Sequence, residues 1–280
     1  VERQQRSFQR RVKTMKRATK ILMSAFCAAV MCFGAFAMGA CGGAKTATVT
    51  ISGSSSVTPV MEKLAAEYEK THDVRITINM SSSGNGIKDT QNGLNDFGMS
   101  SRDLRDKEAG VKGEVLCRDG IALIVNKDCA VDNVTKADVK ALYESGTAIH
   151  DTSITAGVGR DEGSGTRSAF DELLGIESYA GGVSMVAETG NVIESIQGAT
   201  NSIGYVSYGS LSDKVKAVSL DGVACTTDNI VNGTYALQRP FLIVLKEGST
   251  LSEAAQGFYD FIMSAEAQTI ITANKYVSVK

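Results

Sequence analysis

Three segments of the chain repeat one local pattern: an apolar, β-branched run, then a turn rich in serine and glycine, then a helical pattern. The turns span residues 53–59, 81–86 and 159–165. Strands that alternate with helices at this spacing form parallel sheets covered by helices. Ligands of such sheets bind at the carboxyl ends of the strands, which is where the three turns lie. The pattern therefore predicts an α/β protein whose serine turns gather at a ligand site.

The third turn also carries a cation. It reads Gly159-Arg160-Asp161-Glu162-Gly163-Ser164-Gly165-Thr166 and leads into a predicted helix over residues 166–174. Unpaired N–H groups at a helix start and the positive end of the helix dipole both favour negative charge. The guanidinium of Arg160 adds a bidentate fork that matches two oxygens of one anion. The turn therefore predicts a site for a small tetrahedral oxyanion, and simple capping of the helix by Ser164 is the alternative.

The remaining pattern predicts two lobes. Further strands are predicted over residues 121–125, 154–158, 203–206, 215–218 and 240–245, and further helices over residues 136–143, 192–199, 252–263 and 265–274, with a short one from Thr227. Two continuous apolar strands, 121–125 and 240–245, join two similar blocks. We expect each block to form a mainly parallel sheet flanked by helices, with lobe I over residues 47–123 and 240–280 and lobe II over residues 124–239. A cleft between such lobes can close around a solute.

The first 41 residues have the features of a secretion signal. Eight lysine and arginine residues and one acid lie in residues 1–20, and residues 21–40 contain no charge. The apolar run ends in Met38-Gly39-Ala40-Cys41, where small residues precede a cysteine. We therefore expect residues 1–40 to be a lipoprotein signal peptide, with Cys41 lipidated and residues 41–46 forming a tether on the extracytoplasmic face of the cell membrane. An uncleaved membrane helix is the alternative, since about 20 apolar residues can span a bilayer, and Met15 is a candidate start codon.

The expected exported part is acidic. The whole chain has 29 basic and 31 acidic residues, and without the eight basic residues and one acid of the signal, 21 and 30 remain, a net charge of −9. No basic stripe is left for nucleic acid. None of the serine turns contains the Gly-Lys-Ser/Thr of a nucleotide-binding loop. A bound anion must therefore be held by short-range donors in a dry cleft.

Cysteine and histidine give no sign of a metal or a cofactor. After Cys41 the chain has Cys117, Cys129 and Cys225, without zinc-like spacing. Each is expected to be a small buried hydrophobic residue. Export also permits one disulfide, for which Cys129 and Cys225 are the preferred pair. The two histidines lie in unrelated polar contexts, so no metal ligand and no catalytic residue is expected from them.

Seven motifs follow one another between residues 47 and 245. They are Gly53-Ser54-Ser55-Ser56-Val57-x-Pro59, Ser82-Ser83-Gly84-x-Gly86, Asp96-Phe97-Gly98-Met99-Ser100-Ser101-Arg102, Asn133-x-Thr135 with Ala141-Leu142-Tyr143-x-Ser145-Gly146, Arg160-x-Glu162-Gly163-Ser164-Gly165-Thr166-Arg167, Ile203-Gly204-Tyr205-Val206, and Gly233-Thr234-Tyr235-x-Leu237-x-Arg239-Pro240. In this order the set resembles the phosphate-binding lipoproteins of phosphate-specific ABC importers, of the type found in Gram-positive bacteria. The resemblance implies a type II periplasmic-binding-protein fold with one dehydrated phosphate between the lobes.

The resemblance also implies the residues that hold the anion. Carried over by position, they are Ser55, Ser56, Ser82, Ser101, Arg160, Ser164, Gly165 and Thr166. Ser101 stands where some relatives have an aspartate that accepts a hydrogen bond from the proton-bearing oxygen of phosphate. A carboxylate there repels sulfate, which has no proton to donate, so serine weakens that discrimination. Asp161 or Glu162 is the alternative acceptor, although a role in orienting Arg160 and Arg167 is the preferred interpretation for both.

By resemblance, the chain is a binding protein and not an enzyme. It is expected to capture inorganic phosphate as a monomer and to deliver it to the permease subunits of an ABC importer that has a cytoplasmic ATPase. A receptor for sulfate, molybdate or tungstate is one alternative, and an extracellular phosphate sensor or adhesin is another. A secreted serine hydrolase is a third, but the chain has no Gly-x-Ser-x-Gly and neither histidine has an evident carboxylate partner.

Overall fold

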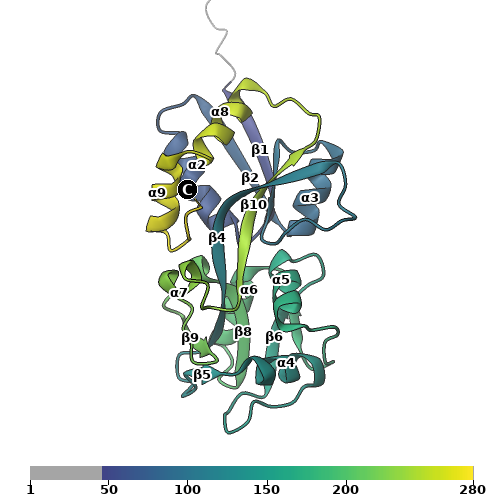
Figure 1. Ribbon diagram of the computed structural model, residues 1–280, viewed down its shortest axis with the longest axis vertical. Helices are drawn as coiled ribbons and strands as arrows, with labels where there is room; N and C mark the ends of the chain where they lie inside the picture. The colour runs from purple at the N-terminus through teal and green to yellow at the C-terminus, as the bar shows by residue number, and fades with distance from the viewer. Residues whose placement is uncertain (1–45, 280) are drawn as a thin grey trace, which may run out of the picture. The chain divides into compact units, whose positions relative to one another are not determined.

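The computed structural model describes residues 46–279. The expected signal peptide over residues 1–40 and the expected lipidation of Cys41 lie outside the described residues. None of the helices between residues 46 and 279 combines the length and the apolarity that a bilayer crossing requires. The described part is a mixed α/β structure with two lobes, as the sequence predicts (Figure 1).

Lobe I is built on five strands in the spatial order β2-β1-β3-β10-β4. Their bounds are β1 Ala47–Ser54, β2 Val74–Ser81, β3 Phe97–Ser100, β4 Val111–Asn126 and β10 Gln238–Lys246. β1 pairs in parallel with β2 and with β3, because a helix returns the chain after each of the first two strands. These helices are α2 (Thr58–Tyr68) and α3 (Ser83–Asn92). Two C-terminal helices, α8 (Glu253–Ile262) and α9 (Ala265–Ala273), pack with α2 into the main core of this lobe, whereas α3 packs into a separate cluster.

Lobe II repeats the alternation of strands and helices. Its strands are β5 Asn133–Val134, β6 Ala156–Arg160, β7 Ser184–Val186, β8 Ser202–Ser207 and β9 Val215–Leu220. Its helices are α4 Lys136–Ser145, α5 Gly165–Leu174, α6 Thr189–Gln197 and α7 Thr227–Val231, with a 3-10 turn, η1, at Tyr208–Ser210. β6 pairs in parallel with β7 and β8, and β5 pairs in parallel with β9.

Two long strands, β4 and β10, connect the lobes (Figure 1). β4 pairs with β10 from Val111 to Gly120, and it pairs with β8 and β9 from Ile121 to Asn126. Among the named strands of the described part, every antiparallel pairing involves β4 or β10. The prediction of mainly parallel sheets therefore holds for the strand–helix units, and the antiparallel ladders belong to the connecting strands.

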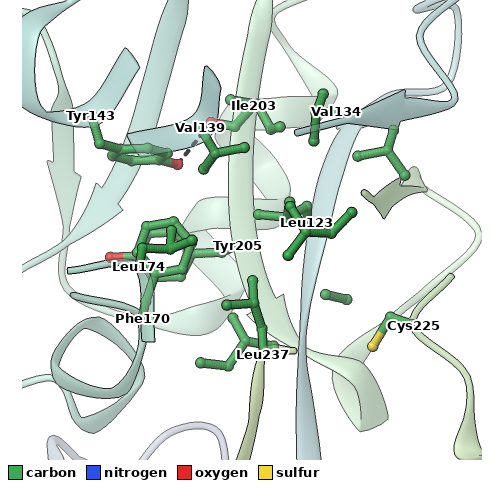
Figure 2. Close-up of a cluster of buried hydrophobic side chains, with 14 of the residues drawn as sticks. Leu123, Val134, Val139, Tyr143, Phe170, Leu174, Ile203, Tyr205, Cys225 and Leu237 are labelled. Atoms are coloured by element: carbon green, nitrogen blue, oxygen red, sulfur yellow. Dashed lines mark hydrogen bonds between the residues drawn. The ribbon is translucent and has the colours of Figure 1, made fainter. Parts of the chain in front are cut away.

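Each lobe has its own hydrophobic core. In lobe II, apolar side chains surround the rings of Tyr143, Phe170 and Tyr205 (Figure 2). The Tyr143 hydroxyl donates within this core, with Val158 O at 3.0 Å and Ile203 O at 3.2 Å, so its polar atom is satisfied. The Phe170 and Tyr205 rings stack with centroids 3.9 Å apart. This stacking ties α5 to β8 directly behind the third serine turn.

Three short strands and the first part of β4 were not predicted from the sequence. β3, β5 and β7 have four residues or fewer, which is too short for a strand period to stand out. The first ten residues of β4 were missed as well, because buried residues there alternate irregularly with exposed charged ones. These segments are strands because they pair with strands that are distant in sequence, which a local pattern does not show.

The preferred disulfide between Cys129 and Cys225 is wrong, because Cys117, Cys129 and Cys225 are all buried free thiols. Cys129 Sγ lies 3.8 Å from Ser153 Oγ. The Cys225 thiol instead faces Gly120 of β4, and burial raises its pKa. The two sulfurs are thus packed against different parts of the lobe.

Candidate functional site

Hydroxyl side chains from both lobes meet in a buried group that we call the polar cluster. Its members lie at the ends of strands or at the starts of helices, and each has 5% or less of its surface exposed. The cluster consists of Ser54, Ser55, Ser56, Ser83, Ser101, Arg160, Ser164, Thr166 and Thr189. Six of the eight predicted anion ligands belong to it, and Gly165 is buried beside it.

The first serine turn contacts lobe II directly. Ser56 Oγ lies 2.8 Å from Thr166 Oγ1, and Ser55 Oγ accepts a hydrogen bond from Arg160 Nη2 at 3.1 Å. Ser54 stays within lobe I, where its hydroxyl donates to Ser101 Oγ at 3.0 Å. The strand end places these side chains because Ser54 is the last residue of β1 and α2 begins at Thr58. The turn therefore presents two neighbouring hydroxyls to the opposite lobe.

The second turn enters the cluster through Ser83. The Ser83 hydroxyl accepts a hydrogen bond from the backbone N–H of Ser101 at 3.1 Å, and it lies 3.3 Å from Ser101 Oγ. Ser82 is half-buried, and its hydroxyl caps α3 by accepting from Asn85 N at 3.2 Å. The resemblance predicts Ser82 at the site and not Ser83. The prediction of Ser83 would have required knowing that α3 begins at this residue. That helix start makes Ser82 the cap and directs the Ser83 side chain inward.

The third turn brings a helix start to the cluster. The Ser164 hydroxyl accepts from Arg167 N at 3.3 Å, so this side chain caps α5, as the simpler interpretation of the turn expected. Within the described residues, the backbone N–H groups of Gly165 and Thr166 have no hydrogen-bond acceptor. A Cβ on Gly165 would lie 2.1 Å from Ser83 Oγ and 2.7 Å from Ser101 Oγ. Glycine is therefore required for this close approach of the two lobes.

Arg160 is a buried cation with only neutral acceptors. Its guanidinium donates to Thr189 Oγ1 at 3.1 Å, to Ser55 Oγ at 3.1 Å, and to Ala187 O from Nη2 at 2.7 Å and from Nε at 3.2 Å. No described carboxylate forms an ion pair with it, whereas the buried Arg102 and Arg239 each pair with one. Burial lowers the pKa of Arg160 to about 10, which keeps the guanidinium protonated at neutral pH.

The backbone of Arg160 is held from two sides. Its N–H donates to the Tyr205 hydroxyl at 3.1 Å, and its carbonyl accepts from Arg167 Nη1 at 3.2 Å. The Arg167 guanidinium also lies over the Tyr179 ring, with Cζ 4.6 Å from the centroid. These contacts fix the peptide from which the guanidinium extends.

Asp161 and Glu162 do not have the orienting role expected of them. Both are exposed, and in the described part of the chain neither forms an ion pair with Arg160 or Arg167. Arg167 instead lies 3.6 Å from Asp171 on its own helix. The turn directs the two carboxylates outward because Gly163 has a φ of 94°, which reverses the chain between them and Ser164.

Thr189 is a cluster residue that sequence reasoning missed. It begins α6, which starts three residues earlier than the predicted helix over 192–199. Its hydroxyl lies 3.2 Å from Ser55 Oγ and 3.1 Å from Ser56 Oγ, so it crosses between the lobes. A threonine before Gly190-Asn191 is a weak helix-start signal, and strand β7 before it has only three residues.

The polar cluster can bind an anion. It offers hydroxyl groups, free helix N–H groups and one cation, and none of its nine members is a carboxylate, histidine or cysteine. The described residues contain no group of three or more such side chains that could hold a metal ion. Donors from several turns that converge on one volume match the several oxygens of a small oxyanion.

Known proteins share this architecture. Residues 40–266 match the model of the PBP superfamily domain. The chain is 30% identical over 258 residues to a phosphate-binding protein PstS of Staphylococcus saprophyticus, and this alignment covers 80% of each protein. A stretch of 132 residues is 40% identical to phosphate-binding protein PstS 2 of Streptococcus pneumoniae. This stretch is 44% of this chain and 45% of that relative. A crystal structure from Clostridium perfringens, described as a phosphate ABC transporter substrate-binding protein with bound phosphate, superposes with a TM-score of 0.79 at 39% identity, over 83% of this chain and 100% of that one.

Proposed function

The chain belongs to the PBP superfamily and, within it, to the phosphate-binding proteins of the PstS type, and on this premise we propose that it captures inorganic phosphate in the polar cluster for delivery to an ABC importer. The site is proposed to comprise Ser55, Ser56, Ser82, Ser101, Arg160, Ser164, Gly165 and Thr166. Ser83 and Thr189 are added to this set on the geometry of the cluster. The proposed role is binding and release, without a chemical step.

One observation carries the proposal: Arg160 is a buried cation with no carboxylate within ion-pair distance among the described residues. A buried charge without a counter-ion is costly, and a bound dianion would remove that cost. The two Nη atoms of Arg160 already point at two oxygens, Ser55 Oγ and Thr189 Oγ1. Each Nη atom carries two N–H groups, so Nη1 can bond one phosphate oxygen while it keeps Thr189, and a second phosphate oxygen can replace Ser55 Oγ at Nη2.

Entry of the anion requires the lobes to separate. The hydroxyls of Ser56 and Thr166 contact each other across the lobes, and the backbone N–H of Gly84 donates to Gly163 O at 3.1 Å. We propose that residues 47–123 with 240–280 and residues 124–239 move as the two lobes. β4 and β10 would then bend where their pairing changes, beside Gly120.

The location and the partners belong to the same proposal. Residues 1–40 would direct export, and a lipid on Cys41 would hold the protein on the extracytoplasmic face of the cell membrane. There it would lie next to the permease subunits of an importer whose ATPase is on the cytoplasmic side. Cys41→Ala should leave a larger form without a lipid. Metabolic labelling with a fatty acid tests this, and equal labelling of the wild type and the variant would contradict it.

Titration calorimetry of the full chain tests the function. We expect phosphate to bind more tightly than sulfate or molybdate. Arg160→Ala should weaken phosphate binding by about 2–5 kcal/mol, because a buried dianion loses its charged partner. Arg75→Ala, which changes an exposed arginine on β2, is the matched control and should bind as the wild type does. Binding by Arg160→Ala within threefold of the wild type would refute the site, and tighter binding of sulfate or molybdate would assign the cluster to that anion.

A further inference from the structure

Thr189 occupies a central position between the lobes. It is the first residue of α6 and is 5% exposed. Its hydroxyl lies 3.1 Å from Arg160 Nη1, 3.2 Å from Ser55 Oγ and 3.1 Å from Ser56 Oγ. Arg160 belongs to lobe II and both serines belong to lobe I. One side-chain oxygen therefore joins the buried cation to the opposite lobe.

The hydrogen-bonding capacity of this hydroxyl is fully used. A threonine hydroxyl has one proton and two lone pairs. The guanidinium can only donate, so Arg160 takes one lone pair of Thr189 Oγ1. The proton of Thr189 and its second lone pair remain for the two serines. A side chain of the same shape without the hydroxyl would leave all three neighbours short of one hydrogen bond.

The backbone just before Thr189 holds the other edge of the guanidinium. Ala187 O accepts from Arg160 Nε at 3.2 Å and from Nη2 at 2.7 Å. Ala187 O and Thr189 Oγ1 thus accept hydrogen bonds at two edges of the guanidinium and fix its orientation. In this orientation Nη2 reaches Ser55 Oγ of lobe I at 3.1 Å.

We propose that Thr189 is a positioning residue of the anion site, which aims the Arg160 fork toward lobe I and couples closure of the lobes to retention of the anion. The proposal rests on the phosphate-binding function proposed above. Its consequence is kinetic: the Thr189 hydroxyl matters after the lobes have closed, so its loss accelerates release of phosphate and leaves capture unchanged.

Two variants of Thr189 in the full chain provide the test. Thr189→Val keeps the shape and removes the hydroxyl, whereas Thr189→Ser keeps the hydroxyl and removes the methyl group. We expect the phosphate Kd of Thr189→Val to rise about 10- to 100-fold, as for loss of a hydrogen bond to a charged group. A chase of bound radiolabelled phosphate should show the same factor in the release rate. Thr189→Ser should stay within threefold of the wild type in both measurements.

Each other result overturns the proposal. Wild-type behaviour of Thr189→Val would mean that the hydroxyl positions nothing. An equal loss in Thr189→Ser would assign the effect to packing of the methyl group. A slower association rate with an unchanged release rate would place the effect before closure.

A measurement without phosphate separates this inference from the function on which it rests. Urea unfolding of Thr189→Val, Ser56→Ala and the double variant forms a double-mutant cycle. Because the two side chains share one hydrogen bond, the shift of the unfolding midpoint in the double variant should be smaller than the sum of the single shifts. Additive shifts would refute the contact between lobes. Non-additive shifts in a protein that does not bind phosphate would refute the proposed function and retain the cross-lobe role of Thr189.

Discussion

Asp119 and Arg239 occupy paired positions on the two strands that connect the lobes, and Arg239 Nη2 lies 3.0 Å from Asp119 Oδ2. Both side chains are almost completely buried. The other carboxylate oxygen of Asp119 accepts from the Ser207 hydroxyl at 2.9 Å. Ser207 is the last residue of β8, so this ion pair ties β4 and β10 to lobe II at the point where β4 changes partners.

Removal of the charge on Asp119 should destabilise the fold strongly. Asp119→Asn leaves the Arg239 guanidinium buried without a counter-ion, and breaking a buried ion pair in this way costs about 3–5 kcal/mol. Urea unfolding at neutral pH measures the loss. Glu67→Gln, which breaks the exposed pair with Lys70, is the matched control and should change stability by about 0.5 kcal/mol or less. A loss below about 1 kcal/mol in Asp119→Asn would contradict the assigned role.

Gly165→Ala should hinder closure of the lobes. The added Cβ would lie 2.1 Å from Ser83 Oγ and 2.8 Å from Ser83 Cβ, so the two turns must move apart. We expect phosphate affinity to fall at least about tenfold, because the donors can no longer converge on the anion. Stability should change little, since alanine is compatible with a helix start. Titration calorimetry and urea unfolding measure the two effects. Gly181→Ala, whose Cβ would meet nothing within 4 Å, should bind normally, and normal binding by Gly165→Ala would refute the argument.

Selectivity between phosphate and sulfate should be limited. The nine members of the polar cluster include no carboxylate, and Ser101 lies within it, hydrogen-bonded to Ser54 and Ser83. A hydroxyl can accept a hydrogen bond from the protonated oxygen of phosphate, or it can rotate and donate a hydrogen bond to sulfate. We therefore expect the wild type to prefer phosphate while still binding sulfate, and Ser101→Asp to reduce sulfate binding further. Competition titrations measure this. An absence of sulfate binding at millimolar concentration in the wild type would show that another acceptor excludes sulfate.

Glu108 should make stability depend on acid pH. Burial alone would raise the pKa of this carboxyl, but hydrogen bonds from the Arg102 side chain and from the Arg105 backbone lower it overall. The folded state then binds fewer protons than the unfolded state, so the contribution of Glu108 is complete above the unfolded pKa of about 4.3 and is lost as pH falls through the folded pKa. Because solvent partly screens this carboxyl, the contribution should be about 1 kcal/mol or less at pH 6.

The test of Glu108 compares urea unfolding of the wild type and of Glu108→Gln at pH 6, 5, 4 and 3. We expect the difference in stability between the two proteins to shrink steadily below pH 5. Glu114→Gln, in a more exposed pair with Lys112, should show almost no such dependence. A difference that stays constant from pH 6 to pH 3 would mean that the carboxylate charge of Glu108 does not contribute.

The sequence predicted the elements of both lobes because their signals are local. Serine and glycine at strand ends and the apolar faces of the helices lie within a few residues of the elements they define. In α8, for example, Ala255, Phe258 and Ile262 are buried as their spacing predicts, while Tyr259 is only half-buried. The arginine turn was identified in the same way, from residues that are consecutive in the chain.

Tertiary structure alone decided which hydroxyls meet. Ser55 and Thr189 are 134 residues apart and lie within hydrogen-bond distance, a relationship that no local pattern contains. The choice between Ser82 and Ser83 depended on the residue at which α3 begins, and one position moves a side chain from the helix cap into the polar cluster. The sequence by itself determined that strand ends would present serines and an arginine to a ligand. Packing of the two lobes decided that Arg160 is buried among neutral oxygens, because burial and the lack of a counter-ion are properties of contacts between distant segments.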